Sequence, residues 1–406
     1  MSDCVLTLNA GSSSVRFALF AARLPLGKAL LSGIADGLGS RARLRVRDAG
    51  GAVLADGALE GAGAAAPTHD DALQAILALL RDRAPEARVA CVGHRIVHGG
   101  VSYEHPVAID ERVLADLAAL EPLAPLHQPH NVAGVHAARH AFPDVTQVAC
   151  FDTAFHRAQP ELNQRFALPR ELHDAGVRRY GFHGISYESI LAQLEAQGRA
   201  AGRVVVAHLG HGASLCAVRD GRSVATTMSF SPLDGLPMGT RCGRLDAAVV
   251  LYLLQQRGMA PERIARLLYR ESGLLGLSGI TGEMRELADS AEPAAREAVD
   301  YYVEHACREL AAMCAALGGL DLLVFTGGIG ENAATIRARI VARSAWMGLA
   351  LDESANASGG ELISAPASAA AIRVLHTDEE AAIARHAARF VSARRQEKGS
   401  ESFPGK

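Results

Sequence analysis

Residues 5–14 and residues 204–214 repeat one chemical outline, and this repeat constrains the fold more than any other feature. Each segment is an apolar strand that runs into a turn of small and hydroxyl-bearing residues, followed by a second apolar strand over residues 15–20 or 215–218. Glycine and serine in such a turn let backbone N–H groups approach an anion closely, because no bulky side chain intervenes. The repeat therefore predicts two related lobes that hold the phosphate chain of a nucleotide in the cleft between them.

The bulk properties agree with a globular protein of two domains. A chain of 406 residues is too long for a single compact core, and 49% hydrophobic with 21% charged residues is an ordinary composition. The net charge of −3 gives no reason to expect a nucleic acid or an anionic membrane as partner. No apolar segment reaches the roughly 18–20 residues that span a bilayer, and the N-terminus lacks the features of a signal peptide. We therefore expect a cytoplasmic protein.

Seven cysteines are scattered through mostly apolar segments: Cys4, Cys91, Cys150, Cys216, Cys242, Cys307 and Cys314. None belongs to a CxxC motif or to a Cys/His pair with the spacing of a zinc site. We expect them to be reduced, buried thiols.

The first lobe begins with the hairpin at residues 5–20. Thr68 and Asp71 form a predicted capping box, and apolar residues at helical spacing behind it predict a helix. The rest of this lobe is predicted as short strands within 33–66, a strand at 88–92, a helix at about 111–120, a Pro/His-rich loop at 122–131 and a strand at 145–151.

The second lobe carries the repeated hairpin, and helices are predicted at about 246–257, 261–269 and 293–317. A strand at 321–326 runs directly into the glycine-rich segment 327–332, with a helix expected from near Ala333. Such a junction is a candidate anion site, because the first N–H groups of a helix are unpaired and its dipole favours negative charge. A strand at 371–376 and a helix from the cap at 377–380 through about Val391 complete the chain.

Histidine, arginine and aspartate collect where predicted strands meet glycine- or proline-rich segments: His94, Arg95, His98, His127, His130, Asp152, His156, His183, His208, His211 and Arg241. An arginine in such a position has few packing constraints and suits bidentate binding of a carboxylate or phosphate. Each of these residues alone is more often a structural hydrogen-bonding group or a surface charge. Together they predict a charged, anion-handling cleft of the kind that phosphoryl transfer needs.

An ordered set of motifs then matches a known family: Leu8–Phe17, Gly93–Gly100, Phe151–His156, Arg179–Gly184, Pro237–Arg241, Gly327–Asn332 and Thr377–Arg385. The chain resembles the acetate kinases, within the acetate and sugar kinase, Hsp70 and actin superfamily, over nearly its whole length. The resemblance implies an α/β fold of two duplicated actin-like (RNase H-like) lobes, with mixed sheets flanked by helices and the nucleotide in the interdomain cleft. We expect lobes at residues 1–152 and 153–379, a helix at about 380–395 that packs back on the first lobe, and a disordered tail at 396–406.

The resemblance also implies an activity: reversible, direct in-line transfer of the γ-phosphoryl group of ATP to acetate, giving acetyl phosphate and ADP. It implies Mg²⁺, or else Mn²⁺, as the metal and a homodimer as the assembly. By motif position, Asn9 and Glu379 would hold the metal, because an amide oxygen and a carboxylate suit a hard ion that keeps several waters. Without the resemblance, Glu379 could be a first-turn helix residue stabilised by the helix dipole.

By the same resemblance, four residues would act on the reacting groups. Arg95 and Arg241 would bracket the acetate carboxylate and the transferring phosphoryl group, which offsets charge as one anion attacks another. His183 would donate to the phosphoryl oxygens, and Asp152 occupies the family's acid/base or positioning site. Since acetate is already ionised near neutral pH, no base is needed, and we expect Asp152 to orient Arg241 or the metal shell.

The remaining implied residues bind the nucleotide or the acyl group. The nucleotide set is Arg16, His208, Leu209, Gly210, His211, Gly212, Glu283, Met284, Arg285, Gly328, Ile329, Gly330, Glu331 and Asn332. The acyl group would meet Val97, Leu126, Phe182 and Pro232, which could equally be plain core residues. A pocket wall discriminates one methylene by only about 1–3 kcal/mol, so acetate over propionate is a preference and not an exclusion.

Six residues depart from the family pattern: Arg16 (usually Lys), Gln128 (Asn), His211 (Asn), Arg244 (an acidic residue), Ala247 (Pro) and Glu283 (Asp). None removes a metal or substrate anchor, so we expect an active enzyme. The imidazole of His211 can donate to a phosphate oxygen and carries charge at low pH, so nucleotide affinity and its pH dependence are where a difference is expected.

Three other functions are weighed against acetate phosphorylation. A neighbouring acyl kinase would act on propionate or butyrate with the same residues. A non-catalytic nucleotide switch of the actin or Hsp70 type would have no need for Arg95, Arg241 and His183. A sugar kinase would need an acidic base and polyol-binding residues in place of the two arginines.

Overall fold

The computed structural model describes residues 2–11, 13–61 and 66–401, without the side chains at 395 and 397–401. The chain divides into two compact units: unit 1 is Met1–Ala154 with Asp378–Lys406, and unit 2 is Phe155–Thr377. Ser12 of the first predicted turn and residues 402–406 of the predicted disordered tail lie outside the described residues.

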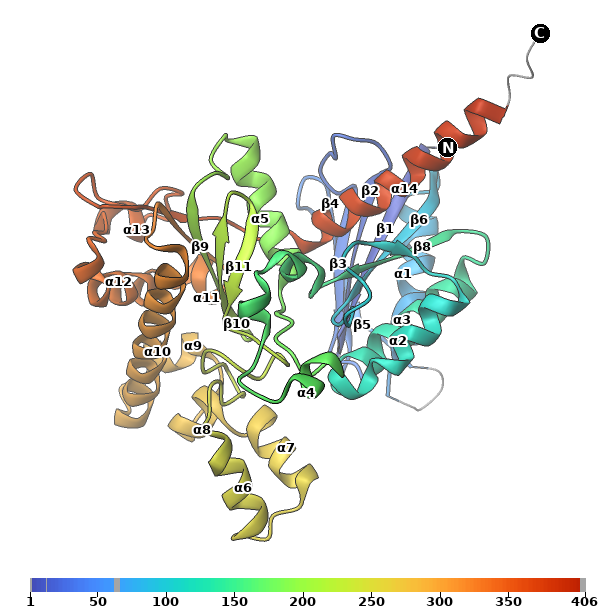
Figure 1. Cartoon of the computed structure of the whole chain (residues 1–406). Coiled ribbons are helices and arrows are strands. Elements are labelled where there is room, and N and C mark those ends of the chain that lie inside the picture. The colour runs from blue at the N-terminus through green and yellow to red at the C-terminus, as the bar shows by residue number, and fades with distance from the viewer. Residues whose placement is uncertain (1, 12, 62–65, 402–406) are drawn as a thin grey trace. The chain divides into compact units, whose positions relative to one another are not determined.

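Unit 1 is built on an eight-stranded sheet with the order β5-β4-β3-β2-β1-β6-β8-β7 (Figure 1). Its strands are β1 (Ser2–Ala10), β2 (Ser14–Ala21), β3 (Leu31–Asp36), β4 (Arg43–Asp48), β5 (Val53–Ala58), β6 (Ala87–Ile96), β7 (Val107–Ala108) and β8 (Thr146–Phe151). Strands β1 to β5 pair antiparallel in succession, whereas β6 is parallel to β1 and β8 is parallel to β6. Most residues of the hairpin β1–β2 are apolar, and Leu6 and Phe17 are fully buried in the core.

The helices of unit 1 are α1 (His69–Arg83), α2 (Glu111–Ala119), α3 (Gln128–Ala141) and α14 (Glu379–Glu401), with a 3-10 turn η1 (Glu121–Leu123). α1 begins at the predicted capping box: Asp71 N donates to Thr68 Oγ1 over 3.2 Å, and Thr68 N donates to Asp71 Oδ2 over 2.8 Å. Its apolar face, which includes the fully buried Ile76, then packs into the core beside β2.

α14 brings the C-terminal part of the chain to unit 1, where it packs against β1 and β6 (Figure 1). Close packing requires a glycine at position 93, because a Cβ there would lie 2.6 Å from Ile383 Cγ2. The helix continues to Glu401, beyond the end expected near residue 395. The packing brings Glu379, the first residue of the helix, next to Asn9 near the end of β1.

Unit 2 is built on a five-stranded sheet with the order β11-β10-β9-β12-β13. Its strands are β9 (Arg203–Leu209), β10 (Ala213–Arg219), β11 (Arg222–Thr226), β12 (Leu322–Thr326) and β13 (Ala371–Val374). Its helices are α4 (Arg170–Asp174), α5 (Gly184–Ala196), α6 (Ala247–Gln255), α7 (Pro261–Arg270), α8 (Gly273–Ser278), α9 (Met284–Asp289), α10 (Pro293–Leu317), α11 (Gly327–Asn332), α12 (Ala334–Arg343) and α13 (Glu353–Ala357). The 3-10 turns are η2 (Ala154–Ala158), η3 (Glu161–Gln164) and η4 (Ala345–Met347). The long helix α10 packs on β9 to β11, while α6 and α7 form a helical pair that projects away from this sheet (Figure 1).

The two sheets share one order of five strands, β3-β2-β1-β6-β8 in unit 1 and β11-β10-β9-β12-β13 in unit 2. In both, an antiparallel hairpin with a third antiparallel strand lies on one side, and two parallel strands lie on the other. Because parallel strands need crossover connections, helices precede or follow them in both units. The predicted α/β fold of two duplicated lobes with mixed sheets is confirmed.

Two segments predicted as a loop and a glycine-rich turn contain helix in the structure. The Pro/His-rich loop contains η1 and the start of α3, because Pro129 falls in the first helical turn, where a proline is tolerated. The glycine-rich segment 327–332 is itself the short helix α11, followed by α12, rather than a turn. Six residues with three glycines carry too little periodicity to predict a helix.

None of the seven cysteines, all of which lie in the described residues, forms a disulfide; five are buried, and Cys242 and Cys307 are half-buried. Burial raises the pKa of the Cys91 and Cys216 thiols to about 12. Among the helices of the described residues, none combines the length and apolar character needed to cross a bilayer.

Candidate active site

Arg95 and Asp152 form the central ion pair of the site in unit 1. Arg95 lies at the end of β6 and Asp152 directly follows β8, so the two adjacent parallel strands bring them to one edge of the sheet. Arg95 Nε donates to Asp152 Oδ1 over 3.0 Å and Nη2 donates to Oδ2 over 2.6 Å, a bidentate contact. Burial acts to lower the pKa of Arg95, but the charges of Asp152 and Glu379 outweigh it and raise that pKa above its ordinary value. The guanidinium is therefore fixed and permanently charged.

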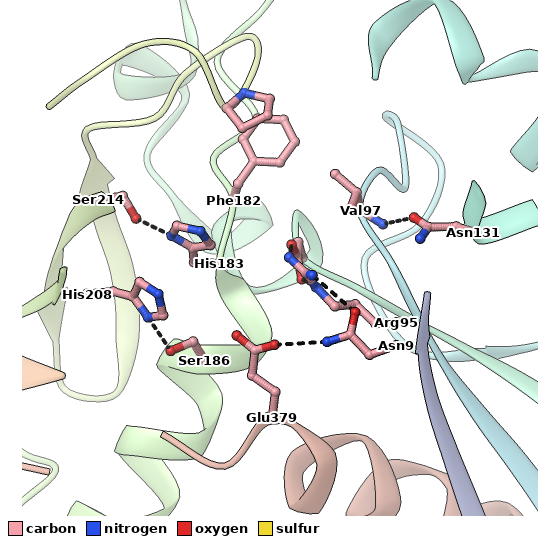
Figure 2. Close-up of polar contacts among 12 residues, drawn as sticks. Asn9, Arg95, Val97, Asn131, Phe182, His183, Ser186, His208, Ser214 and Glu379 are labelled. Atoms are coloured by element: carbon pink, nitrogen blue, oxygen red, sulfur yellow. Dashed lines mark hydrogen bonds and ion pairs between the residues drawn. The ribbon is translucent and has the colours of Figure 1, made fainter. Parts of the chain in front are cut away.

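Asn9 and Glu379 complete this set (Figure 2). Asn9 Nδ2 donates to Glu379 Oε2 over 3.4 Å, and Asn9 Oδ1 accepts from Arg95 Nη1 over 3.2 Å. One amide oxygen and one carboxylate therefore lie beside the guanidinium of Arg95. In the described part of the chain, no group of three or more His, Cys, Asp or Glu side chains is arranged to hold a metal.

The β1–β2 turn is held by side chains from two helices. Asn131, in the first turn of α3, donates from Nδ2 to the Ala10 carbonyl over 2.7 Å and accepts the Val97 N–H at Oδ1 over 2.9 Å (Figure 2). His69 Nε2 lies 2.6 Å from the carbonyl oxygen of Gly11. The buried side-chain amide of Asn131 thereby links the β1–β2 turn to Val97, the residue that follows β6.

In unit 2, the segment before α5 adopts an unusual backbone conformation. His183 has φ of 60°, in the left-handed region that few non-glycine residues occupy. Gly181 also has positive φ, and a Cβ there would lie 2.6 Å from the ring of His156. His156 Nε2 in turn lies 2.9 Å from the Phe182 carbonyl oxygen. Packing against His156 therefore holds the strained segment and sets the position of His183.

Two histidine–serine hydrogen bonds cross between α5 and the β9–β10 hairpin (Figure 2). His183, before α5, pairs through Nδ1 with Ser214 Oγ of β10 over 2.9 Å. His208 of β9 pairs through Nδ1 with Ser186 Oγ of α5 over 2.8 Å. Since His208 and Ser214 face each other in the β9–β10 register, the two bonds brace the helix against the hairpin. The two imidazole rings lie with centroids 4.3 Å apart.

Two glycine-rich segments lie side by side in unit 2. A Cβ on Gly210 would lie 3.7 Å from Gly328 N, and a Cβ on Gly327 would lie 2.8 Å from the Leu209 carbonyl oxygen. Gly327 has φ of 77°, which only glycine adopts without strain. The repeated hairpin and the start of α11 thus present adjacent stretches of bare backbone, as an anion-binding surface requires.

Glu331 directs its carboxylate to protein groups around these glycines. Its Oε1 accepts from Gly327 N over 2.9 Å and from Thr377 N over 3.1 Å, and its Oε2 lies 2.7 Å from His376 Nδ1. This residue, expected at the nucleotide, therefore joins the start of α11 to the segment that leaves unit 2.

Arg241 follows the Met238–Thr240 loop and donates from Nη1 to the Pro232 carbonyl over 3.1 Å. A Cβ on Gly212 would lie 3.4 Å from His183 Nε2 and 3.6 Å from Arg241 Nη1. The imidazole of His183 and the guanidinium of Arg241 therefore both lie next to Gly212, where no side chain fills the space.

Several departures from the family pattern have partners in the structure. His211 Nδ1 lies 3.5 Å from Glu283 Oε1, so two of the unusual residues contact each other at an exposed site. Arg244 pairs with the buried Glu309 of α10 over 3.1 Å. Gln128 is fully buried and donates from Nε2 to the carbonyls of His98 and Leu117, which is a structural role.

The structure assigns the predicted residues to the two units as follows. In unit 1, Val97 is buried and Leu126 is half-buried, while Arg16 is exposed opposite Asn9 in the β1–β2 register. In unit 2, Phe182, Pro232 and Gly330 are buried, Ile329 is half-buried, and Gly328 and Asn332 are exposed. Met284 is buried in the interior while Arg285 is exposed. Asp152 holds Arg95, a partner that sequence analysis did not assign to it.

Sequence reasoning missed three polar residues that position the predicted ones: Asn131, Ser186 and Tyr187. Asn131 was part of a predicted loop, and its place in the first turn of a helix explains why it reaches two backbone groups. Ser186 and Tyr187 follow His183 within three and four residues. That spacing puts them on the same side of a helix, but the helix itself was not predicted.

Comparison with known proteins points in one direction. The model of the acetokinase family matches residues 4–385. An acetate kinase of Methylocella silvestris is 52% identical over 394 residues, which cover 95% of this chain and 97% of that protein. An acetate kinase of Rhodopseudomonas palustris strain TIE-1 is 51% identical over 403 residues, which cover 97% of this chain and 100% of that protein.

Solved structures give the same picture. A propionate kinase from Francisella tularensis matches with a TM-score of 0.87 and 34% identity, covering 95% of this chain and 99% of that one. Porphyromonas gingivalis acetate kinase matches with a TM-score of 0.84 and 35% identity, covering 96% of this chain and 100% of that one.

Two units with one strand order, each presenting polar side chains and glycine turns at the ends of its central strands, define a class: the two-lobed α/β phosphotransferases of actin-like fold. Within this class, the chain belongs to the acetokinase family, whose enzymes use a carboxyl group as phosphoryl acceptor.

Proposed function

We propose that the protein is an acetate kinase that reversibly transfers the γ-phosphoryl group of ATP to acetate, giving acetyl phosphate and ADP. The observation that carries the proposal is the single hydrogen-bonded set of Asn9, Arg95, Asp152 and Glu379, whose first and last members are 370 positions apart. This set combines a fixed guanidinium with oxygen donors, which suits a carboxylate acceptor and a metal-bound phosphate. The names of the relatives, acetate and propionate kinases, support a short carboxylate as the acceptor.

Arg95 would bind the acetate carboxylate or the transferring phosphoryl group. Three of its five N–H groups bind Asp152 and Asn9, which leaves two donors for an anion. Arg241 would share this task, so that two guanidinium groups offset the repulsion between an anionic nucleophile and the phosphoryl oxygens. Acetate is ionised at neutral pH, so Asp152 is needed to orient Arg95 and not to remove a proton.

The nucleotide phosphates would be bound by unit 2, where the glycines of the β9–β10 turn and of α11 offer bare backbone. His183 would donate a hydrogen bond to the oxygens of the phosphoryl group during in-line transfer. The exposed pair of His211 and Glu283 would lie toward the rest of the nucleotide.

Mg²⁺ fits the donor set of Asn9 and Glu379. One amide oxygen and one carboxylate are hard ligands, and Mg²⁺ usually takes one or two protein ligands together with water and substrate phosphates. When bound, the ion would neutralise charge on the nucleotide phosphates. Arg95, which shares Asn9 with that set, would keep the acceptor next to it.

The acyl group would meet Val97 and Leu126 of unit 1 and Phe182 and Pro232 of unit 2. Val97 and Phe182 are 4% and 1% exposed, so each presents an apolar wall that is fixed by packing. Propionate is the second candidate acceptor, because the Francisella tularensis protein named a propionate kinase is so similar in structure. One methylene changes binding by only about 1–3 kcal/mol.

The test is an ATP- and Mg²⁺-dependent hydroxamate assay with acetate, propionate and butyrate. We expect acyl phosphate from acetate at the highest kcat/KM, with propionate roughly 10- to 100-fold lower. Equal or higher kcat/KM for propionate would make the protein a propionate kinase. Absence of product from all three acids would refute the proposal.

A variant pair tests the role of the guanidinium in the same assay. Arg95→Lys keeps the charge but loses the fork, so kcat/KM for acetate should fall by about 100-fold. Arg88→Lys is the matched control on the same strand, because Arg88 lies near the opposite end of β6, pairs with Asp3 of β1 and has an exposed side chain. It should leave the kinetics unchanged.

We further propose that the protein is a homodimer held together through α6. Eight of the nine residues of this helix are apolar, yet none of them is buried. A helix that is apolar on all sides is normally covered, and a second copy would present the same patch in a self-complementary interface. Leu251, Tyr252 and Leu254 are the most exposed of its large apolar side chains, at 52%, 51% and 42%.

A further inference from the structure

We propose that Tyr187 and Ser214 are positioning residues that hold His183 as a neutral imidazole with its proton on Nε2, the nitrogen that would donate to the transferring phosphoryl group. The inference rests on the proposed function in one respect, the role of His183 as a donor. It assigns a task to two side chains that do not touch the substrates.

The three side chains form one chain of hydrogen bonds, which runs from the buried Tyr187 and Ser214 to the half-buried His183. Tyr187 Oη lies 2.5 Å from Ser214 Oγ, and Ser214 Oγ lies 2.9 Å from His183 Nδ1. Tyr187 and Ser214 are both 0% exposed, so water does not compete for the bond between them. Tyr187 lies on α5, one helical turn after His183, and Ser214 lies on β10. Tyr187 therefore reaches the histidine through the strand and not through its own helix.

The chemistry of the groups sets the direction of these bonds. A phenol is a stronger acid than an aliphatic alcohol, so Tyr187 donates to Ser214 in a contact as short as 2.5 Å. Burial raises the pKa of Tyr187 well above its ordinary value, so the phenol keeps its proton. Thr226 also interacts with the phenol, but its hydroxyl donates to the Leu215 carbonyl over 2.9 Å and so does not donate to Tyr187. Because Ser214 Oγ accepts the phenol proton, its own hydroxyl proton can be donated to another group.

Ser214 gives that proton to the best acceptor within reach, which is an imidazole nitrogen. With Nδ1 accepting from Ser214, a neutral His183 must carry its own proton on Nε2. The Nε2 atom lies beside Gly212, where Arg241 Nη1 also lies. A neutral imidazole can share this place with a guanidinium without like-charge repulsion, and the two groups together offer N–H donors to one anion.

Steady-state kinetics of Tyr187→Phe, Ser214→Ala and the double variant test the proposal. Tyr187→Phe removes one oxygen atom from the interior, and kcat should fall by about tenfold or more because the donor is no longer held in place. The KM values for acetate and ATP should stay within about twofold, since neither residue contacts a substrate. Because Tyr187 acts only through Ser214, the double variant should be no slower than Ser214→Ala alone.

Tyr302→Phe is the matched control. Tyr302 is also 0% exposed in unit 2, and its hydroxyl has no hydrogen-bond partner among the described residues. Removal of that hydroxyl should leave kcat unchanged. Thermal unfolding of all variants shows whether a loss of kcat reflects a loss of folded protein.

Nitrogen-15 NMR of histidine-labelled protein reads the tautomer directly, with His183 assigned by the signal that disappears in His183→Asn. We expect a protonated Nε2 and an unprotonated Nδ1 in the wild type, and a mixture of tautomers in Tyr187→Phe. A proton on Nδ1 in the wild type, or a kcat of Tyr187→Phe within twofold of the wild type, would overturn the proposal. The spectra need no substrate, so they remain decisive even if the hydroxamate assay rejects acetate as the acceptor.

Discussion

At the scale of single residues, three buried histidines contribute to the sensitivity of the protein to acid. Burial lowers the pKa of His94, His98 and His156 from 6.5 to about 4. Each is therefore neutral in the folded protein, whereas in the unfolded chain it binds a proton as the pH falls through about 6.5. The stability that these histidines contribute is full above that pH and is lost as the pH falls toward 4.

His156→Gln should weaken this acid sensitivity in unit 2. At pH 7 the variant is less stable than the wild type, because the contacts of His156 with Phe182 and Ser223 are disturbed. At pH 5 the wild type has lost about 2 kcal/mol through this histidine while the variant has not, so the difference in unfolding free energy shrinks by that amount. Urea unfolding at both pH values measures it.

His105→Gln serves as the control, because it is the same substitution at a histidine whose side chain is exposed. If the stability difference between wild type and His156→Gln is the same at pH 5 and pH 7, His156 is not the source of the acid sensitivity.

Single residues also show what a sequence reveals about a site. Asn9, Arg95 and Glu379 were predicted because each belongs to a motif, and the structure places Asn9 within hydrogen-bond reach of the other two. Tyr187 belongs to no such motif, and a tyrosine in an apolar helix has the same sequence pattern whether or not its hydroxyl has a function. Its contact with Ser214 depends on the packing of α5 on β10, which only the fold determines.

At the scale of elements, the packing of α14 on β6 is the contact that sets the position of Glu379 beside Asn9, the two proposed metal ligands. A Cβ at position 93 would lie 2.6 Å from Ile383 Cγ2, so Gly93→Ala should push the helix outward and lower the unfolding free energy by about 1–3 kcal/mol. Because Glu379 begins this helix and Asn9 lies on β1, the Mg²⁺ concentration for half-maximal activity should rise. Urea unfolding and Mg²⁺ titration of activity measure the two effects.

Two further variants decide whether this contact is the cause. Replacement of Ile383 by Leu in the Gly93→Ala background removes the methyl group that would clash, and it should restore both stability and Mg²⁺ response. Gly57→Ala on β5 should be silent, because a Cβ there meets no atom within 4 Å. If Gly93→Ala leaves the Mg²⁺ response unchanged, the packing of α14 on β6 does not control metal binding by the proposed ligands Asn9 and Glu379.

Elements differ in how far the sequence predicts them. The two hairpins and α1 were predicted because apolar strands, small-residue turns and a capping box are local signals. α5 was missed because it is buried on most of its surface, so its apolar residues show no helical stripe. The start of α3 was missed because a segment rich in proline and histidine resembles a loop, although a proline is also tolerated in the first turn of a helix.

At the scale of the whole molecule, the chain passes between its units twice, once near Ala154 and once near Thr377. The second passage is held on the unit 2 side by Glu331, which binds Thr377 N and His376 while also binding Gly327 N. The backbone that would bind phosphate and the segment that leads to Glu379, the proposed metal ligand, are therefore bound by the same carboxylate. No local sequence pattern predicts this link, since it joins residues 46 positions apart.

Substitutions in the exposed helix α6 test whether the protein forms the proposed homodimer. Replacement of Leu251 and Leu254 by glutamate puts two charges into an apolar surface, and their desolvation would oppose association of two copies. Light scattering should give the mass of two chains for the wild type and of one chain for the double variant. Trp346→Glu is the control, because this side chain is 75% exposed on η4 in the same unit, outside α6. If the control alone dissociates, or if the wild type has the mass of one chain, then α6 is not a dimer interface and its apolar surface needs another partner.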